Sequence, residues 1–251
     1  MIGFLRLAVV AIPATVWFGS RIIWAAFRKS PKLPCICERL PRRWSRLLLK
    51  AAGARVVLEN ERLIDPDRPQ ILIANHVSWF DVLVVAGYLP GSYRFIAKKE
   101  LAKVPFFGAS WRACGHIAID RQDINQAKGA LALAEKELAE ERPTVILFPE
   151  GTRSETGELR RFKKGAFVLA IKSGIEVVPA AILGTRDVMA KGSWRIRTGR
   201  TVTLRFGAPM SVDGLTMDDR DALARKGRDA VAHLLESGHE TMNENPTNES
   251  R

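Results

Sequence analysis

Hydrophobic and polar positions divide this chain into an apolar N-terminal arm and a longer region where short apolar runs alternate with helical patterns. The arm, residues 1 to 27, is interrupted only by a few polar side chains, among them Arg6 and Arg21. Its uncharged stretch, Leu7 to Ser20, is short for a spanning helix, which needs about 20 residues. Including the rest of the arm reaches that length but puts Arg21 inside the span. We predict a membrane-associated helix that either spans the bilayer or lies on it, and a cleaved signal peptide is the alternative.

The next segment, Arg39 to Ala52, predicts an amphipathic helix with basic faces. Its apolar residues have helical spacing, at Leu40, Trp44, Leu47, Leu48 and Ala51. A basic amphipathic helix beside a very apolar one is typical of an interfacial membrane anchor, because its cations meet lipid phosphates. The alternative is a helix that packs on the protein's own core and leaves its basic face in water.

Beyond this arm, strand-like and helix-like segments alternate, which predicts an α/β fold with a mostly parallel central sheet flanked by helices. Predicted strands are Ala54–Glu59, Gln70–Ala74, Tyr93–Ala97, Ile117–Ile119, Thr144–Phe148, Val177–Leu183 and Thr201–Phe206. Predicted helices are Trp79–Leu89, Val104–Cys114, Gln126–Glu141, Lys164–Ser173 and Asp218–Glu236, the last preceded by a capping box of Thr216 and Asp219. The expected division is 1–53 for membrane-associating helices, 54–236 for the α/β domain and 237–251 for a disordered polar tail.

Composition adds a strong positive charge to this picture. The 251 residues carry a formal net charge of +12, and 47% of them are apolar, enough for a substantial core. Such a charge favours an anionic partner: nucleic acid, acidic lipid or a phosphorylated metabolite. Much of the basic charge lies beside apolar helices and no nucleic-acid-binding motif is present, so we expect a membrane phospholipid surface and no nucleic acid.

Three cysteines, Cys35, Cys37 and Cys114, are expected to be free thiols in a reducing compartment. Cys35 and Cys37 are too close in the chain for an ordinary disulfide. No second Cys/His pair has the spacing of zinc ligands, so no metal site is predicted.

A histidine and an aspartate follow the second predicted strand, in the run Asn75-His76-Val77-Ser78-Trp79-Phe80-Asp81. We expect His76 in the loop and Asp81 in the first helical turn, where the carboxylate can reach one imidazole nitrogen and leave the other to act as a base. No Gly-x-Ser-x-Gly motif is present, so the activated hydroxyl is expected to belong to the substrate. A structural role is the alternative, because Ser78 and Asp81 are also spaced as a capping box.

A second motif, Phe148-Pro149-Glu150-Gly151-Thr152-Arg153-Ser154, follows the fifth predicted strand. Gly151 lets backbone N–H groups approach an anion, and Arg153 can bind phosphate through two parallel hydrogen bonds. Ligands of parallel sheets bind at the carboxyl ends of strands, where both motifs lie. The pair predicts chemistry on a phosphate-bearing substrate, and a surface turn with solvated charges is the alternative.

Together the two motifs resemble the signature of the glycerolipid acyltransferases, and most closely that of the bacterial 1-acyl-sn-glycerol-3-phosphate acyltransferases. Two weaker blocks agree in order: Phe95–Leu101 with Pro105–Gly108, and Val177–Ala180. The resemblance covers roughly residues 70 to 185.

The resemblance implies acyl transfer from an acyl thioester, acyl-CoA or acyl carrier protein, to the sn-2 hydroxyl of lysophosphatidic acid, giving phosphatidic acid for phospholipid biosynthesis. No cofactor is implied beyond that co-substrate. His76 would be the general base and Asp81 its orienting partner. Residues implied in substrate binding are Lys98, Glu150, Gly151, Thr152 and Arg153. The expected location is the cytoplasmic face of the cell inner membrane, as a monotopic protein or with a single N-terminal span.

Three other functions remain open at this point. The acceptor can be another lysolipid, such as lyso-ornithine lipid, or glycerol 3-phosphate. The chain can also be a non-catalytic membrane adaptor on a degenerate fold, although the His76–Asp81 pair favours an enzyme. A nucleic-acid binder is the third.

Overall fold

The computed structural model describes residues 2–120 and 123–243. Its centre is a seven-stranded sheet in the order β1-β7-β6-β2-β5-β3-β4, in which the β6–β7 pair is antiparallel and the other pairs are parallel. The strands are β1 (Ala54–Glu59), β2 (Gln70–Ala74), β3 (Tyr93–Lys98), β4 (Ile117–Ile119), β5 (Thr144–Leu147), β6 (Val177–Leu183) and β7 (Arg200–Phe206). The predicted mostly parallel α/β fold is confirmed.

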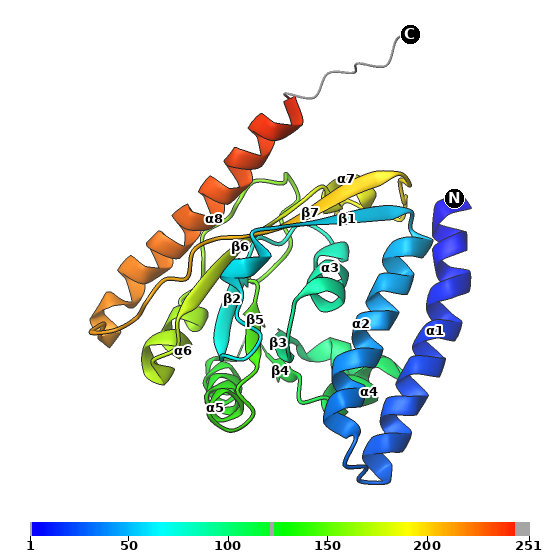
Figure 1. Ribbon diagram of the computed structural model, residues 1–251, viewed down its shortest axis with the longest axis horizontal. Coiled ribbons are helices and arrows are strands. Elements are labelled where there is room, and N and C mark those ends of the chain that lie inside the picture. Colours follow the sequence, from blue (N-terminus) through cyan, green and yellow to red (C-terminus); the bar gives the residue numbers. More distant parts are fainter. Residues whose placement is uncertain (1, 121–122, 244–251) are drawn as a thin grey trace.

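Helices cover both faces of the sheet (Figure 1). They are α1 (Ile2–Phe27), α2 (Leu33–Ala51), α3 (Phe80–Tyr88), α4 (Phe107–Ala113), α5 (Ile124–Glu140), α6 (Gly165–Ser173), α7 (Thr185–Val188) and α8 (Arg220–Asn243). Short 3-10 turns lie at η1 (Glu61–Leu63), η2 (Lys99–Lys103) and η3 (Met217–Asp219), and the predicted capping box precedes α8. The tail predicted from residue 237 begins too early, since α8 continues to Asn243; residues 244–251 lie outside the described part.

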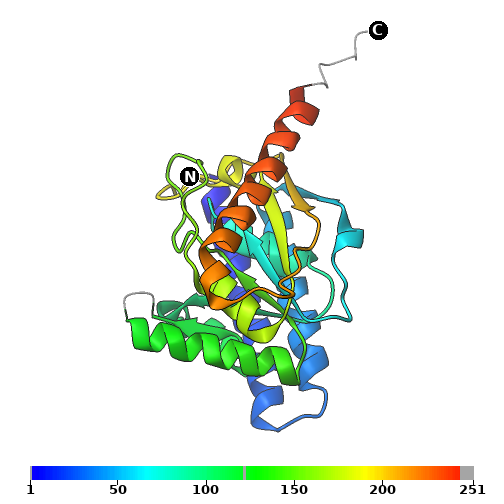
Figure 2. The same cartoon turned by 90° about the vertical axis from the view of Figure 1, so that its left-hand side faces the viewer.

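Alternating side chains of the central strands fill two separate cores. Leu72 and Ala74 of β2 face a core shared with α2 and α3, whereas Ile71 and Ile73 face a core shared with α5, α6 and α8. All five residues of β2 are buried, which explains why this strand is apolar except for its first residue. Figure 2 shows α5 and α8 on the second face. This burial on both sides fixes the carboxyl end of β2, where the histidine motif begins.

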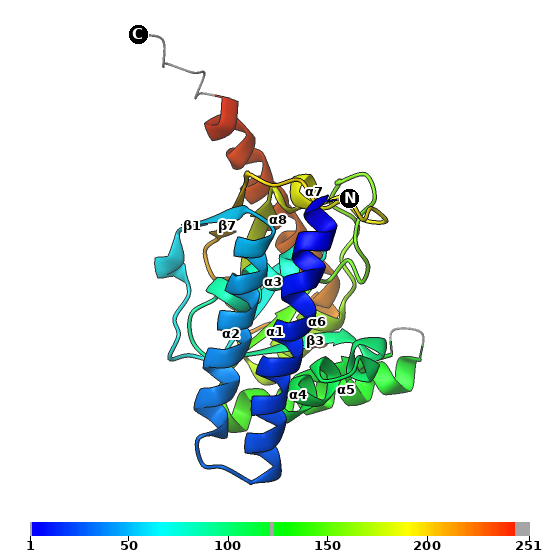
Figure 3. The same cartoon turned by 90° about the vertical axis from the view of Figure 1, so that its right-hand side faces the viewer.

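The N-terminal arm is a helical hairpin that lies along one side of the α/β domain (Figure 3). α1 packs against α2 and α4, and α2 packs against α3. Pro13 lies inside α1 without ending it. From Phe4 to Phe27 this helix has the length and hydropathy of a membrane-crossing segment, and most of that segment is left uncovered by the rest of the chain.

The expectation of three free thiols is wrong, because Cys37 of α2 and Cys114 after α4 form a disulfide, and only Cys35 is free. The spacing argument compared Cys35 with Cys37 alone, whereas the bond joins residues 77 positions apart. Packing of the hairpin against the domain brings their Cα atoms to 5.2 Å. The bridge links the N-terminal hairpin covalently to the α/β domain.

Candidate active site

The end of β2 is tied to β6 by an asparagine side chain. Asn75 is buried, donates from Nδ2 to the carbonyl oxygen of Ile182 at 2.9 Å, and accepts from the Ile182 N–H at Oδ1 at 2.7 Å. The side-chain amide thus makes the two hydrogen bonds that a further residue of β2 would make with the backbone of β6. This contact fixes the point at which the chain leaves the sheet and presents His76.

His76 and Asp81 form the pair that the spacing predicted. His76 Nδ1 lies 2.7 Å from Oδ2 of Asp81, and the same oxygen accepts the backbone N–H groups of Val77 and Ser78 at 2.7 and 2.8 Å. The Asp81 side chain is fully buried, while 13% of the His76 side chain is exposed. With Nδ1 donating to Asp81, Nε2 remains as the basic nitrogen of a neutral imidazole. Asp81 therefore organises the loop and contacts the histidine, as the capping and orienting interpretations both expected, and the catalytic role of the pair stays a prediction.

The second oxygen of Asp81 is held by a residue that the sequence analysis missed. Thr185, at the start of α7, is buried and donates its hydroxyl to Asp81 Oδ1 at 2.5 Å. Gly184 makes this approach possible: its φ is +80°, and a Cβ there would lie 2.3 Å from the carbonyl oxygen of Thr201. The neighbouring Ser78 hydroxyl donates to the Met189 carbonyl at 2.6 Å, so α7 and its flanks support the histidine loop twice.

The Glu150–Ser154 loop forms hydrogen bonds with both the backbone N–H and the backbone carbonyl of His76. Glu150 Oε1 accepts the His76 N–H at 2.7 Å, and the His76 carbonyl accepts the Ser154 N–H at 2.8 Å. The other Glu150 oxygen accepts the Arg160 N–H at 3.1 Å. Burial raises the pKa of Glu150, and the two backbone donors act in the opposite direction. Both carboxylate oxygens are thus occupied by the protein itself, which makes Glu150 a positioning residue in this geometry.

Arg153 lies within the same loop and faces the histidine motif. Its guanidinium carbon is 4.7 Å from the ring centroid of Trp79, which is 46% exposed. Partial burial lowers the pKa of Arg153, and the negative charge of Asp81 acts in the opposite direction. A cation in electrostatic contact with Asp81 can bind a phosphate whose neighbouring hydroxyl reaches the imidazole.

Gly151 shapes the turn of this loop. Its φ is +76°, and a Cβ there would lie 2.8 Å from Cε of Lys163, so the lysine side chain runs across the glycine. Lys163 is exposed and adds positive charge beside Arg153's loop. Thr152 is exposed at the loop surface.

Lys98 stands apart from these groups. It ends β3, its side chain is 65% exposed, and it forms a 3.3 Å ion pair with Glu100. β3 pairs with β5, the strand that leads into the Glu150–Ser154 loop, on the side away from β2. Its role in substrate binding stays a prediction.

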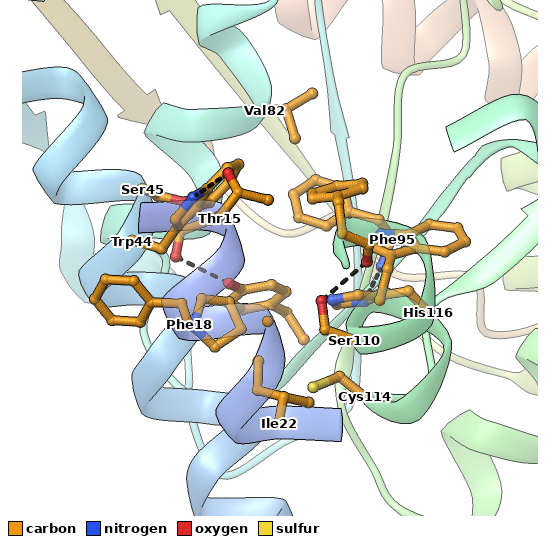
Figure 4. Close-up of a pocket in the computed structure, with 16 residues that line it drawn as sticks. Thr15, Phe18, Ile22, Trp44, Ser45, Val82, Phe95, Ser110, Cys114 and His116 are labelled. Carbon is orange, nitrogen blue, oxygen red and sulfur yellow. Dashed lines mark hydrogen bonds between the residues drawn. The ribbon is translucent and has the colours of Figure 1, made fainter. Parts of the chain in front are cut away.

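An apolar cavity lies on the α3 side of the sheet, between the N-terminal hairpin, α4 and β3 (Figure 4). It is narrow and partly open to solvent, with a volume of about 60 Å³. Val82 and Ala86 on α3 contribute to the wall, one and five residues after Asp81. Aromatic side chains form much of the remainder: Phe18, Trp44, Tyr93, Phe95, Phe107 and Trp111.

Comparisons with known proteins show the family of this chain. The sequence model of the family named Acyltransferase matches residues 55–183. A 1-acyl-sn-glycerol-3-phosphate acyltransferase of Chlamydomonas reinhardtii is 35% identical over 181 residues, which cover 71% of this chain and 52% of that protein. The alpha form from Homo sapiens is 33% identical over 183 residues, covering 73% of this chain and 63% of that protein. The chain thus spans between about half and two thirds of the length of these curated relatives.

The fold also resembles a solved structure. The crystal structure of the 1-acyl-sn-glycerophosphate (LPA) acyltransferase PlsC from Thermotoga maritima superposes with a TM-score of 0.79 at 26% identity, covering 94% of this chain and 95% of that chain. The family match includes the histidine loop, the Glu150–Ser154 loop and β6, which together form the candidate site. The chain belongs to the acyltransferase family.

Proposed function

We propose that this chain transfers an acyl group from an acyl thioester to the sn-2 hydroxyl of lysophosphatidic acid and so forms phosphatidic acid. One observation carries the proposal: the loop that contains Arg153 bonds both backbone groups of His76. A proton acceptor and an anion-binding guanidinium are therefore held in one unit. An acceptor that carries its phosphate close to a free hydroxyl requires this arrangement.

The chemistry follows from these positions. Arg153 binds the acceptor phosphate, which places the sn-2 hydroxyl beside Nε2 of His76. The imidazole takes the hydroxyl proton while the oxygen attacks the thioester carbonyl carbon and forms a C–O bond. Collapse of the tetrahedral intermediate breaks the C–S bond, and the imidazolium returns its proton to the leaving thiolate. Asp81 stabilises the imidazolium, and general-base catalysis of this kind typically contributes about 10²–10⁴-fold.

The apolar cavity supports an acylated substrate. Its wall is mostly aromatic and aliphatic, and α3 connects it to the turn that carries Asp81. We assign it to an acyl chain, because such a chain gains roughly 0.8 kcal/mol for each buried CH₂ group. Acyl-CoA and acyl carrier protein are both retained as donors, and no further cofactor is needed for the reaction.

The N-terminal hairpin supports work at a phospholipid surface. α1 leaves an apolar face uncovered while its other side packs on α2 and α4, which favours a helix lying in the interface over one that crosses the bilayer alone. The inner membrane and its cytoplasmic face stay predictions. The Cys37–Cys114 disulfide is an argument against the reducing compartment that three free thiols would indicate.

The test is product identity with purified chain, lysophosphatidic acid and a panel of acyl-CoA and acyl carrier protein donors, measured by mass spectrometry. His76→Ala is expected to lower turnover by about 10²–10⁴-fold with an unchanged thermal unfolding curve. His233→Ala, at an exposed position of α8, is the matched control and should keep full activity. Substantial turnover by His76→Ala would refute the assigned base.

A panel of acceptors separates the related functions. Phosphatidic acid from lysophosphatidic acid supports the proposal. Preference for lyso-ornithine lipid or for glycerol 3-phosphate would replace it with another acyltransferase activity. If the chain releases no thiol from any donor with any of these acceptors, the result would indicate a membrane adaptor.

A further inference from the structure

The exposed side of α1 carries an apolar stripe, interrupted by Ser20. Leu5, Val9, Ile12 and Val16 are each between 39% and 67% exposed and follow one another at intervals of three or four residues. Trp24 and Phe27 continue the same face and are 60% and 79% exposed. The buried residues of α1 lie on its other sides: Ala14, Gly19, Ile22 and Ala25. None of residues 2–120 and 123–243 covers this stripe, which is available to a partner outside the chain.

A second exposed aromatic side chain from a distant part of the sequence joins the stripe at its N-terminal end. Trp194 is 75% exposed and packs edge-to-face against Phe4, with ring centroids 5.3 Å apart. It belongs to the loop Met189–Gly199, between α7 and β7, which we call the tryptophan loop. Figure 3 shows this segment beside the start of α1. The uncovered surface thus extends from the hairpin onto the α/β domain.

The tryptophan loop has a defined conformation. The Arg197 N–H donates to the Val188 carbonyl at 2.9 Å, the Ser193 N–H donates to the Ala190 carbonyl at 3.1 Å, and Ile196 is buried. An exposed tryptophan held on an ordered loop loses little conformational freedom when it enters another phase. The ordered backbone of the loop therefore keeps Trp194 exposed.

Positive charge surrounds the exposed aromatic residues. Arg195 and Arg197 flank Trp194 and are exposed. On α1, the guanidinium carbon of Arg21 lies 5.2 Å from the Trp17 ring centroid. Aromatic rings bordered by arginines are typical of the boundary between acyl chains and headgroups, where the ring is partly in hydrocarbon and the cation meets phosphate.

We propose that the tryptophan loop is a second membrane-contacting element, in which Trp194 enters the interface of an anionic phospholipid bilayer next to α1 while Arg195 and Arg197 contact lipid phosphates. The inference rests on the proposed action at a membrane surface. An apolar ring within a basic rim fits an anionic bilayer better than it fits an apolar protein groove.

The tryptophan loop also contacts the loop of the candidate active site that contains Arg153. Lys191 of the tryptophan loop donates a hydrogen bond from Nζ to the Arg153 carbonyl at 3.0 Å and pairs with Glu155 at 2.9 Å. Because Lys191 bonds the backbone of Arg153, the loop that carries this arginine lies next to the proposed membrane contact. We expect the acceptor to reach the candidate active site while its acyl chain stays in the membrane.

The first test uses a fluorescent label. In a Cys35→Ser background, Trp194→Cys is labelled with an environment-sensitive dye and mixed with vesicles of phosphatidylcholine alone or with phosphatidylglycerol. We expect a blue-shifted emission and quenching by lipids with bromine near the headgroup, stronger with the anionic lipid. Val9→Cys on α1 is the positive reference and Leu133→Cys, exposed on α5, the negative one. A silent label at 194 with a responding label at 9 would overturn the inference.

The second test uses the otherwise unchanged chain. Trp194→Ala should lower partitioning onto anionic vesicles by about five- to tenfold, and Leu133→Ala should leave it unchanged. Acyl transfer to a long-chain acceptor in vesicles should fall in parallel, while transfer to a monomeric short-chain lysophosphatidic acid should persist. Equal losses with both acceptors, or unchanged partitioning, would refute a membrane role for Trp194. If neither label responds and wild-type chain does not bind vesicles, the inference fails, and activity on the monomeric acceptor still decides separately whether the proposed enzyme function stands.

Discussion

The hydroxyl of Thr185 donates to Oδ1 of Asp81 at 2.5 Å, across 104 residues of sequence, and the other oxygen of that carboxylate meets His76. Every hydrogen bond made by this carboxylate comes from the loops that follow β2 and β6. The carboxylate is therefore fixed in orientation before substrate binds.

Thr185→Val should disturb this orientation without removing volume. Loss of a hydrogen bond to a buried charge typically costs about 1.5–3 kcal/mol, so we expect kcat to fall roughly ten- to hundredfold with little change in KM. Thr185→Ser keeps the hydroxyl and should restore most of the rate. Steady-state kinetics of both variants decide the matter, and equal activity of the valine and serine variants would exclude a positioning role.

Arg153→Ala should act mainly on the acceptor. We expect KM for lysophosphatidic acid to rise about tenfold or more, because the charge-assisted bonds to phosphate are lost. Arg161→Ala, eight residues along the chain and exposed, is the control and should change KM little. Wild type and Arg153→Ala should use a monoacylglycerol acceptor, which has no phosphate, equally poorly. If Arg153→Ala were less active than wild type with monoacylglycerol, phosphate recognition by Arg153 would be contradicted.

Gly151→Ala should damage the same loop through its backbone. The positive φ of +76° disfavours any side chain, and the new methyl group would meet Lys163. We expect a loss of about 1–3 kcal/mol in the free energy of unfolding, measured by urea denaturation, with reduced activity. Gly192→Ala has a similar φ of +78° but open space around it, so comparing the two isolates the contact with Lys163. An equal loss in both variants would leave backbone strain alone as the cause.

His116 gives the fold a defined pH dependence. It lines the apolar cavity, accepts the Phe95 N–H at Nδ1, and burial lowers its pKa to about 3. Below pH 6.5 the unfolded chain binds a proton here that the folded chain does not, so stability falls as pH falls from 6.5 toward 3. Between pH 7 and pH 5 this residue should remove about 2 kcal/mol of stability.

The measurement compares urea unfolding of wild type and His116→Phe at both pH values. Because phenylalanine does not titrate, the variant should lose about 2 kcal/mol less than wild type over this interval, whatever its stability at pH 7. Identical pH dependence in the two proteins would contradict a neutral histidine at this position of the fold.

The Cys37–Cys114 disulfide is checked by counting thiols. Denatured, unreduced chain should react with one maleimide, at Cys35, and reduced chain with three. Closing a loop over a separation of 77 residues is worth about 4 kcal/mol in the chain-entropy model, so Cys37→Ser with Cys114→Ser should unfold at lower urea concentration. Cys35→Ser is the control. Three reactive thiols before reduction would refute the bridge.

The alternation of apolar runs and helical patterns predicted the fold closely. β1, β2, β4 and β6 have the predicted bounds. For β2 and β6, which are buried along their whole length, a run of consecutive apolar residues marks the strand. Errors occurred where packing decides the outcome: α8 extends past its predicted end at Glu236 to Asn243, and the four-residue α7 carries no periodic pattern. Helix ends and single turns depend on their surroundings.

By itself the sequence determined that a histidine, an aspartate and an arginine follow neighbouring strands, because each motif is local and parallel strands end at one edge. Only the tertiary structure decided which other residues complete the site. Asn75 and Thr185 are single polar residues whose partners lie more than 100 positions away, and Cys37 finds Cys114 only after the hairpin docks. Such contacts depend on the geometry of packed elements, which no short stretch of sequence encodes.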